Sequence, residues 1–291
     1  MTSNELEDIL KKMCRDEFEA YHIYKFLGNH LRAGEDVRNL FKRASEDEWG
    51  HYQILSEIVG KCESSVSKFK VLVFALISLV FGTTVTLKLV ESLERKAKKS
   101  YSELVGARGE LSKRILKLVN DEERHELDMI SNLNESRVKY LSSIALGVSD
   151  ALVELTGIYA GALGVLTSTS STGLIGVLAG ISAALSMSVA SYTQAKQEVG
   201  KSPRLAALFT GLSYSLVVIA LALPYFLAAS KVIAFSLMLI IALTLIAYMS
   251  FYSSVLHGRK YLKEFAENSL LLLGVAFLLY FLGNLFSIAS G

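Results

Sequence analysis

Residues 48–51 read Glu-Trp-Gly-His and residues 122–125 read Glu-Glu-Arg-His, and these two stretches decide the fold of this chain. Both are Glu-x-x-His motifs. In an α-helix, residues three positions apart lie on the same face. Each motif therefore directs one carboxylate and one imidazole toward a single point, as a pair of metal ligands requires.

The sequence that precedes each motif is also repeated. Glu17 is followed by Tyr24 and Glu94 by Tyr101, so both segments read Glu-x6-Tyr, at nearly equal distances before a Glu-x-x-His motif. All four stretches carry apolar residues at helical spacing, which predicts four helices. Tyr24 and Tyr101 either donate a hydrogen bond to a ligand carboxylate or pack in the core.

A four-helix bundle with one Glu from each of two helices and Glu-x-x-His from each of the others supplies the ligands of a carboxylate-bridged di-metal centre. A single such motif is commonly a solvated helix face, whereas the repeat favours a metal site. Oxygen and imidazole ligands favour iron or manganese, and zinc also binds them. The predicted ligands are Glu17, Glu48, His51, Glu94, Glu122 and His125.

Charge divides the chain into two parts. Of 58 charged residues, 46 precede Tyr140, with 23 basic and 23 acidic among them, and 12 follow. Neither part is basic enough to indicate nucleic-acid binding. We predict an all-α protein, with a four-helix bundle at 1–135 and a five-helix transmembrane domain at 136–291.

Five apolar segments in the second part are long enough to cross a hydrocarbon core of ~30 Å, which takes ~20 residues. The connections after the second and fourth segments each carry three basic residues, which indicates the cytoplasmic side. We therefore predict a multi-pass cell-membrane protein with a cytoplasmic N-terminal domain and an external C-terminus. The segments are roughly 141–166, 173–195, 205–229, 232–256 and 269–289.

Two further features bear on this topology. Cys14 and Cys62 form no recognisable pair framework, and the first thirty residues are charged rather than apolar, unlike a signal peptide. Unpaired cysteines suit a reducing compartment. Residues 71–87 (VLVFALISLVFGTTVTL) lack charge. As a spanning helix they would place Glu17 and Glu94 on opposite sides of the membrane. We therefore expect them to lead into a long third helix, packed on the membrane surface, the other domain or a partner subunit, with a spanning helix as the alternative.

The first apolar segment contains two carboxylates, Asp150 and Glu154, one helical turn apart. Buried carboxylates in a bilayer usually mark an ion path, and no basic residue within a span could neutralise them. Glu267, at the start of the fifth segment, is either a point where ions enter or an interfacial charge. The candidate path residues read from these features are Asp150, Glu154 and Glu267.

Residues 1–135 resemble the ferritin-like domain of rubrerythrin type, through the six predicted ligands. The remainder resembles the vacuolar iron transporter family, through Gly147-Val148-Ser149-Asp150-Ala151-Leu152-Val153-Glu154, Ala179-Gly180, Ser186-Met187-Ser188 and Gln194. Together they resemble membrane-bound ferritins. The resemblance implies five spans and a homodimer. It also adds Met187 to the candidate path residues as a thioether ligand, whereas the sequence alone favours a methionine that faces lipid or the core.

The sequence departs from that family in two places. The connection after the second segment is short and holds only Glu198 as an acidic residue, where many relatives have a Glu-rich metal-collecting segment. The N-terminal domain would then collect the metal. Ser191 stands where the family often has Glu, which puts a ligand role there in doubt.

These observations predict a transporter of Fe²⁺ or Mn²⁺ that exports or sequesters the ion, with proton exchange at Asp150 and Glu154 as a possible coupling. The ferritin-like domain would collect or oxidise the metal, so ferroxidase activity stays open. The alternatives are a membrane-anchored di-iron oxidase or peroxidase and a metal sensor. Five spans exceed what an anchor requires.

Overall fold

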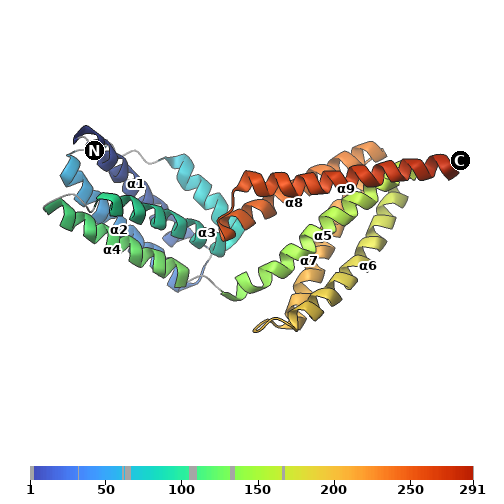
Figure 1. Cartoon of the computed structure of the whole chain (residues 1–291), viewed down its shortest axis with the longest axis horizontal. Coiled ribbons are helices and arrows are strands. Elements are labelled where there is room, and N and C mark those ends of the chain that lie inside the picture. The colour runs from blue at the N-terminus through green and yellow to red at the C-terminus, as the bar shows by residue number, and fades with distance from the viewer. Residues whose placement is uncertain are drawn as a thin grey trace. The chain divides into compact units, whose positions relative to one another are not determined.

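The computed structural model describes residues 3–31, 33–60, 62, 67–104, 110–131, 135–165 and 168–290. Every regular element in these ranges is an α-helix, which confirms the all-α class. The chain divides into two compact units, Met1–Asn134 and Glu135–Gly291 (Figure 1). The boundary predicted at residue 135 adjoins residues 132–134, which lie outside the described residues.

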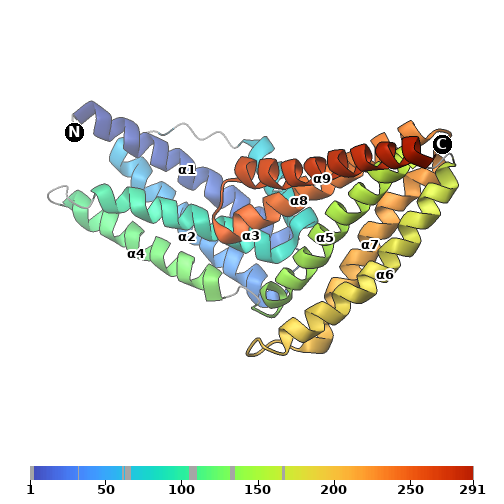
Figure 2. The same cartoon turned by 45° about the vertical axis from the view of Figure 1, so that its right-hand side comes forward.

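The first unit is built from two helix pairs, visible in Figure 2. The first helix packs along the second and the third along the fourth. The helices are α1 (Ser3–His30), α2 (Glu35–Val59), α3 (Lys68–Leu104) and α4 (Glu110–Ser131). The first turn of α2 contains Glu35 and Asp36, whose negative charges interact favourably with the positive end of the helix dipole. The helix ends before Gly60, whose φ of 79° is rarely adopted by other residues.

Two apolar clusters fill this unit on either side of a polar layer. One contains Ile23, Leu27, Phe41 and Val90, and the other contains Leu10, Leu55, Ile115 and Leu118. On each helix the predicted metal ligands fall between a segment that joins one cluster and a segment that joins the other. The ligands are therefore held in a low-dielectric environment, where charges interact strongly.

α3 is interrupted at Gly82, whose φ of 77° and ψ of −175° are not helical. Figure 1 shows the two parts of α3 meeting at a bend. Before the bend, Val71 and Phe74 pack against the cluster around Ile23; after it, Glu94 lies buried in the same unit. Residues 71–87 therefore do not separate Glu17 from Glu94 by a membrane, and α3 is long, as expected.

Cys14 and Cys62 form a disulfide that ties α1 to the segment after α2. The expectation of unpaired cysteines is wrong. The two Cα atoms are 6.4 Å apart, within the ~4.4–6.8 Å that a disulfide bridges. The pairing was not visible in the sequence because 48 positions separate the two residues and only packing of α1 against α2 brings them together. The cysteines therefore no longer support a reducing compartment.

In the described part of the second unit, five helices cover the predicted apolar segments. Their starts have local causes: Ser168 and Ser230 accept hydrogen bonds from backbone N–H groups three residues on, and Pro203 occupies the first turn of its helix. The helices are α5 (Glu135–Val165), α6 (Thr169–Ala195), α7 (Pro203–Leu227), α8 (Lys231–His257) and α9 (Tyr261–Ser290).

Small residues allow the helices of this unit to approach closely. A Cβ at Gly176 would lie 2.2 Å from the ring of Tyr159, and one at Gly283 would lie 2.3 Å from the carbonyl oxygen of Gly161. A Cβ at Gly180 would lie 2.6 Å from Val218. The Gly-x-x-x-Gly motifs at 157–161 and 176–180 therefore serve contacts within the chain.

Among the described residues, six helices are long and apolar enough to cross a membrane: α3 and α5 to α9. Five of them cover the segments predicted to span. The sixth is α3. Only its first half has the apolar composition of a span, because its second half carries Glu91 and Glu94, which are buried in the first unit. The chain therefore has the character of a membrane protein.

Candidate metal centre

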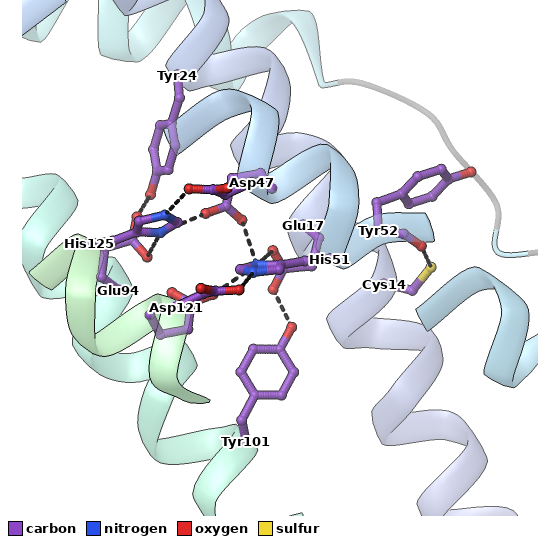
Figure 3. Close-up of polar contacts among 12 residues, drawn as sticks. Cys14, Glu17, Tyr24, Asp47, His51, Tyr52, Glu94, Tyr101, Asp121 and His125 are labelled. Carbon is purple, nitrogen blue, oxygen red and sulfur yellow. Dashed lines mark hydrogen bonds and ion pairs between the residues drawn. The ribbon is translucent and has the colours of Figure 1, made fainter. Parts of the chain in front are cut away.

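The six predicted ligands meet in the polar layer of the first unit. α1 contributes a Glu, α2 a Glu and a His, α3 a Glu, and α4 a Glu and a His. Every one of these side chains is at most 4% exposed. Figure 3 shows Glu17, His51, Glu94 and His125 converging from different helices. The helical periodicity of the ligands places them on the inner faces, and the antiparallel packing brings those faces to the same level.

The ligand atoms form two overlapping groups, each within 4.8 Å. Glu48 and Glu122 belong to both groups. The first group adds Glu17 and His51, and the second adds Glu94 and His125. Two neighbouring ions with two shared carboxylates fit this arrangement, which is the pattern of carboxylate-bridged di-metal proteins.

Distances within the groups suit ligands of a common ion. His51 Nδ1 lies 3.4 Å from Glu17 Oε2 and 3.4 Å from Glu122 Oε1. His125 Nδ1 lies 3.2 Å from Glu48 Oε1. Bonds of ~2.1 Å at right angles would place neighbouring ligand atoms ~3 Å apart.

Several buried ligand atoms lack a hydrogen-bond partner among the described residues. A buried polar atom without a partner is costly, so such atoms are rare unless they bind something else. Here the unpartnered atoms point into one cluster and are the donors a cation needs. They are Glu17 Oε2, Glu48 Oε1, His51 Nδ1, both Glu122 carboxylate oxygens and His125 Nδ1. The residues present therefore fit a pair of metal ions.

Two aspartates hold the imidazoles in place. His51 Nε2 lies 3.3 Å from Asp121 Oδ2, and His125 Nε2 lies 3.1 Å from Asp47 Oδ2 (Figure 3). A carboxylate on one ring nitrogen fixes the tautomer and orients the other nitrogen, here Nδ1, toward the ion. Asp47 and Asp121 were not predicted. Their signal was present, because each motif reads Asp-Glu-x-x-His.

The two repeated tyrosines contact the ligands of the opposite repeat. Tyr24 donates a hydrogen bond to Glu94, and Tyr101 donates one to Glu17. Both rings are buried in the apolar clusters. Of the two roles considered from sequence, the structure therefore supports orientation of a ligand carboxylate, combined with packing.

Crowded carboxylates make the metal-free centre retain protons. Burial and repulsion from Glu17 raise the pKa of Glu48 to about 8, and burial with repulsion from Glu94 raises the pKa of Glu122. Burial lowers the pKa of His125, but the neighbouring carboxylates of Asp47 and Glu48 outweigh burial and raise that pKa to about 12. Divalent cations would replace these protons as the neutralising charge.

A cavity of about 780 Å³ opens onto the ligand cluster between α1 and α3. Ile23, Phe74 and Leu93 contribute to its walls, and Glu17 and Glu94 lie at the cluster itself. The cavity gives small molecules and ions access to the ligands from one side of the bundle.

Residues 8–132 match the family model described as Rubrerythrin. The N-terminal unit is a rubrerythrin-like domain. Rubrerythrin-like domains usually bind iron, and the buried Glu and His groups of this one could hold a metal ion. Neither the curated proteins nor the solved structures gave a match to this chain. The rubrerythrin match ends before α5, so it concerns the first unit alone.

The proposed path residues lie in the second unit. Glu154 lies on α5, one helical turn after Asp150. It accepts a 2.6 Å hydrogen bond from Tyr214 on α7. Met187 is half-buried against the apolar core of this unit. Glu267 is exposed and lies 3.7 Å from Lys263. Groups of three or more His, Cys, Asp or Glu side chains that could hold an ion are found, among described residues, in the rubrerythrin-like domain only.

Proposed function

We propose that this membrane-associated iron-binding protein transports Fe²⁺ or Mn²⁺, and that the rubrerythrin-like domain collects or oxidises the ion first. Iron bound at the six-ligand centre supplies redox chemistry with oxygen or peroxide. The ions would be held by four carboxylates and two imidazoles, those of Glu17, Glu48, Glu94, Glu122, His51 and His125. Asp47 and Asp121 would keep the imidazoles oriented.

The observation that carries transport is the placement of Glu154. This carboxylate lies in the apolar stretch of α5, one turn from Asp150, and Tyr214 donates a hydrogen bond that orients it. An acidic residue at bilayer depth is unfavourable by ~2.5–3.5 kcal/mol on insertion scales. A passing divalent cation or a proton would offset that unfavourable energy, so the pair suits exchange of one for the other.

Flux through the full-length protein in proteoliposomes tests this proposal. Metal uptake should depend on a pH gradient and should be lost in Asp150→Asn and Glu154→Gln, while iron bound by the rubrerythrin-like domain stays at the parental level. As a control, His51→Ala with His125→Ala should lose that bound iron and leave the second unit folded. Parental flux in both carboxylate variants would place the path elsewhere.

A membrane-anchored oxidase or peroxidase is the second candidate, and the cavity at the ligand cluster favours it. A volume of about 780 Å³ exceeds what a metal ion or dioxygen needs and is in the range of cavities that admit organic substrates. If the parent protein shows no metal flux yet consumes peroxide or oxygen with iron bound, this function replaces transport.

A further inference from the structure

The first half of α3 carries a row of exposed apolar side chains. Ahead of the break at Gly82, five large apolar residues are each more than half exposed. Their spacing of three, four, three and one positions places them within an arc of ~100° on a helix. They are Phe69 (73%), Leu72 (56%), Leu76 (51%), Leu79 (62%) and Val80 (52%).

The opposite side of the same helix is already used. Val71 and Phe74 pack against the apolar cluster that includes Ile23, and Lys70 pairs with Glu19 on α1. The helix is thus fixed on the bundle by one face and leaves the other uncovered. Five large apolar side chains exposed together on one face of a helix are uncommon on a protein surface that contacts only water.

This helix cannot cross a bilayer by itself. Residues 68–81 rise only ~21 Å at 1.5 Å per residue, less than the ~30 Å of a hydrocarbon core. After Gly82 the chain returns into the bundle, where Glu91 and Glu94 are buried. A helix lying along a membrane surface needs no such length, since only its apolar face enters the interface.

The position of the bend identifies the occupant. Arg95 of α3 bonds to Glu126 of α4 at 3.0 Å, and Met129 of α4 packs in the same cluster as Leu87 and Val90 of α3. The last turn of α4 therefore lies at the level of the turns of α3 that follow Gly82. Only residues 132–134 separate α4 from α5, the first helix of the apolar unit. The bundle end that contains Gly82 is thus the end at which the chain leaves the bundle for the apolar helices of the second unit.

Basic side chains accompany the uncovered face. Lys68 and Lys25 line a shallow hollow beside the start of α3, with His22 and His30. Lysines next to an apolar helical face favour a surface of anionic lipid headgroups. We propose that residues 68–81 form an interfacial helix whose face of Phe69, Leu72, Leu76, Leu79 and Val80 lies in the lipid headgroup region, holding the rubrerythrin-like domain against the membrane.

Tryptophan fluorescence tests the proposal in the full-length protein. Trp49 is the chain's single tryptophan, so Trp49→Phe gives a dark background. Leu76→Trp on the proposed face is compared with Leu116→Trp on α4, a site of similar exposure (51% and 47%). The protein is placed in vesicles of zwitterionic and anionic lipids with brominated acyl chains. We expect quenching at position 76 to exceed that at position 116 at least about threefold.

A second position and a second measurement keep the outcome decisive. Leu79→Trp should be quenched like Leu76→Trp, and parental iron content in all variants shows that the bundle is folded. Equal quenching at positions 76 and 116 overturns the proposal. So does efficient cross-linking between two copies through Leu76→Cys without lipid quenching, because the face would then be an interface with a second copy.

Discussion

His51 Nε2 lies 3.3 Å from Asp121 Oδ2, although the two residues belong to different halves of the repeat. Likewise, His125 Nε2 of the second motif lies 3.1 Å from Asp47 Oδ2 of the first. Each Asp-Glu-x-x-His motif thus supplies ligands of its own and the aspartate that orients the histidine of the other motif. The two halves of the bundle are therefore coupled through the centre, and one half alone would hold an incomplete site.

Removing the charge of the orienting aspartate should weaken metal binding while keeping every ligand. We expect Asp121→Asn to lower iron affinity ~10–100-fold, because the imidazole loses the carboxylate that sets its tautomer. Competition titration against a chelator measures this. Glu123→Gln is the matched control, since Glu123 is exposed on the same helix and bonds only weakly, 3.8 Å from Lys98. Equal affinities of the two variants would contradict the role of Asp121.

Metal affinity should rise with pH. Below pH 8, Glu48 is protonated in the metal-free centre, and His125, with a pKa of about 12, is protonated throughout the neutral range. Cation binding must expel these protons, so we expect affinity to increase at least about tenfold per pH unit between pH 6 and 8. Calorimetry in buffers of different ionisation enthalpy counts the protons released. An affinity that does not change with pH would be inconsistent with protonated ligands.

Gly176→Ala should destabilise the second unit. The added Cβ would lie 2.2 Å from the ring of Tyr159, which stacks on Tyr225 at 4.3 Å and is fully buried. Overpacking of this kind lowers the free energy of unfolding by ~1–3 kcal/mol. Thermal unfolding in detergent measures the loss, and iron content should not change. Gly274→Ala, where a Cβ meets nothing within 4 Å, should behave as the parent does.

Sidedness can be read by labelling single cysteines in whole cells. Because the cytoplasmic placement of the basic connections predicts that residues 168–172 face outward, a cysteine there should react with an impermeant reagent. A cysteine at Ser202, in the basic connection after α6, should react only after the cells are opened. Labelling of both positions from the same side would refute the five-span topology.

Sequence alone was sufficient for the all-α class and for naming the six side chains that meet in one buried cluster. Ligand spacing is a local property: Glu48 and His51 share a helical face wherever that helix lies. The apolar segments are likewise recognisable locally, because each carries its own hydropathy over the length a bilayer requires. Repetition of the motif then raised a weak local pattern to a prediction that the fold supports.

Only the tertiary structure decided which groups meet between helices. These contacts all join residues at least 48 positions apart. They are the contact of His51 with Asp121, the hydrogen bonds from Tyr24 to Glu94 and from Tyr101 to Glu17, and the Cys14–Cys62 disulfide. Such contacts depend on the register in which helices pack, which local periodicity leaves open. The break at Gly82 belongs with them: the uncharged run of residues 71–87 reads as one apolar helix, and packing against α1 and α4 determines where it turns.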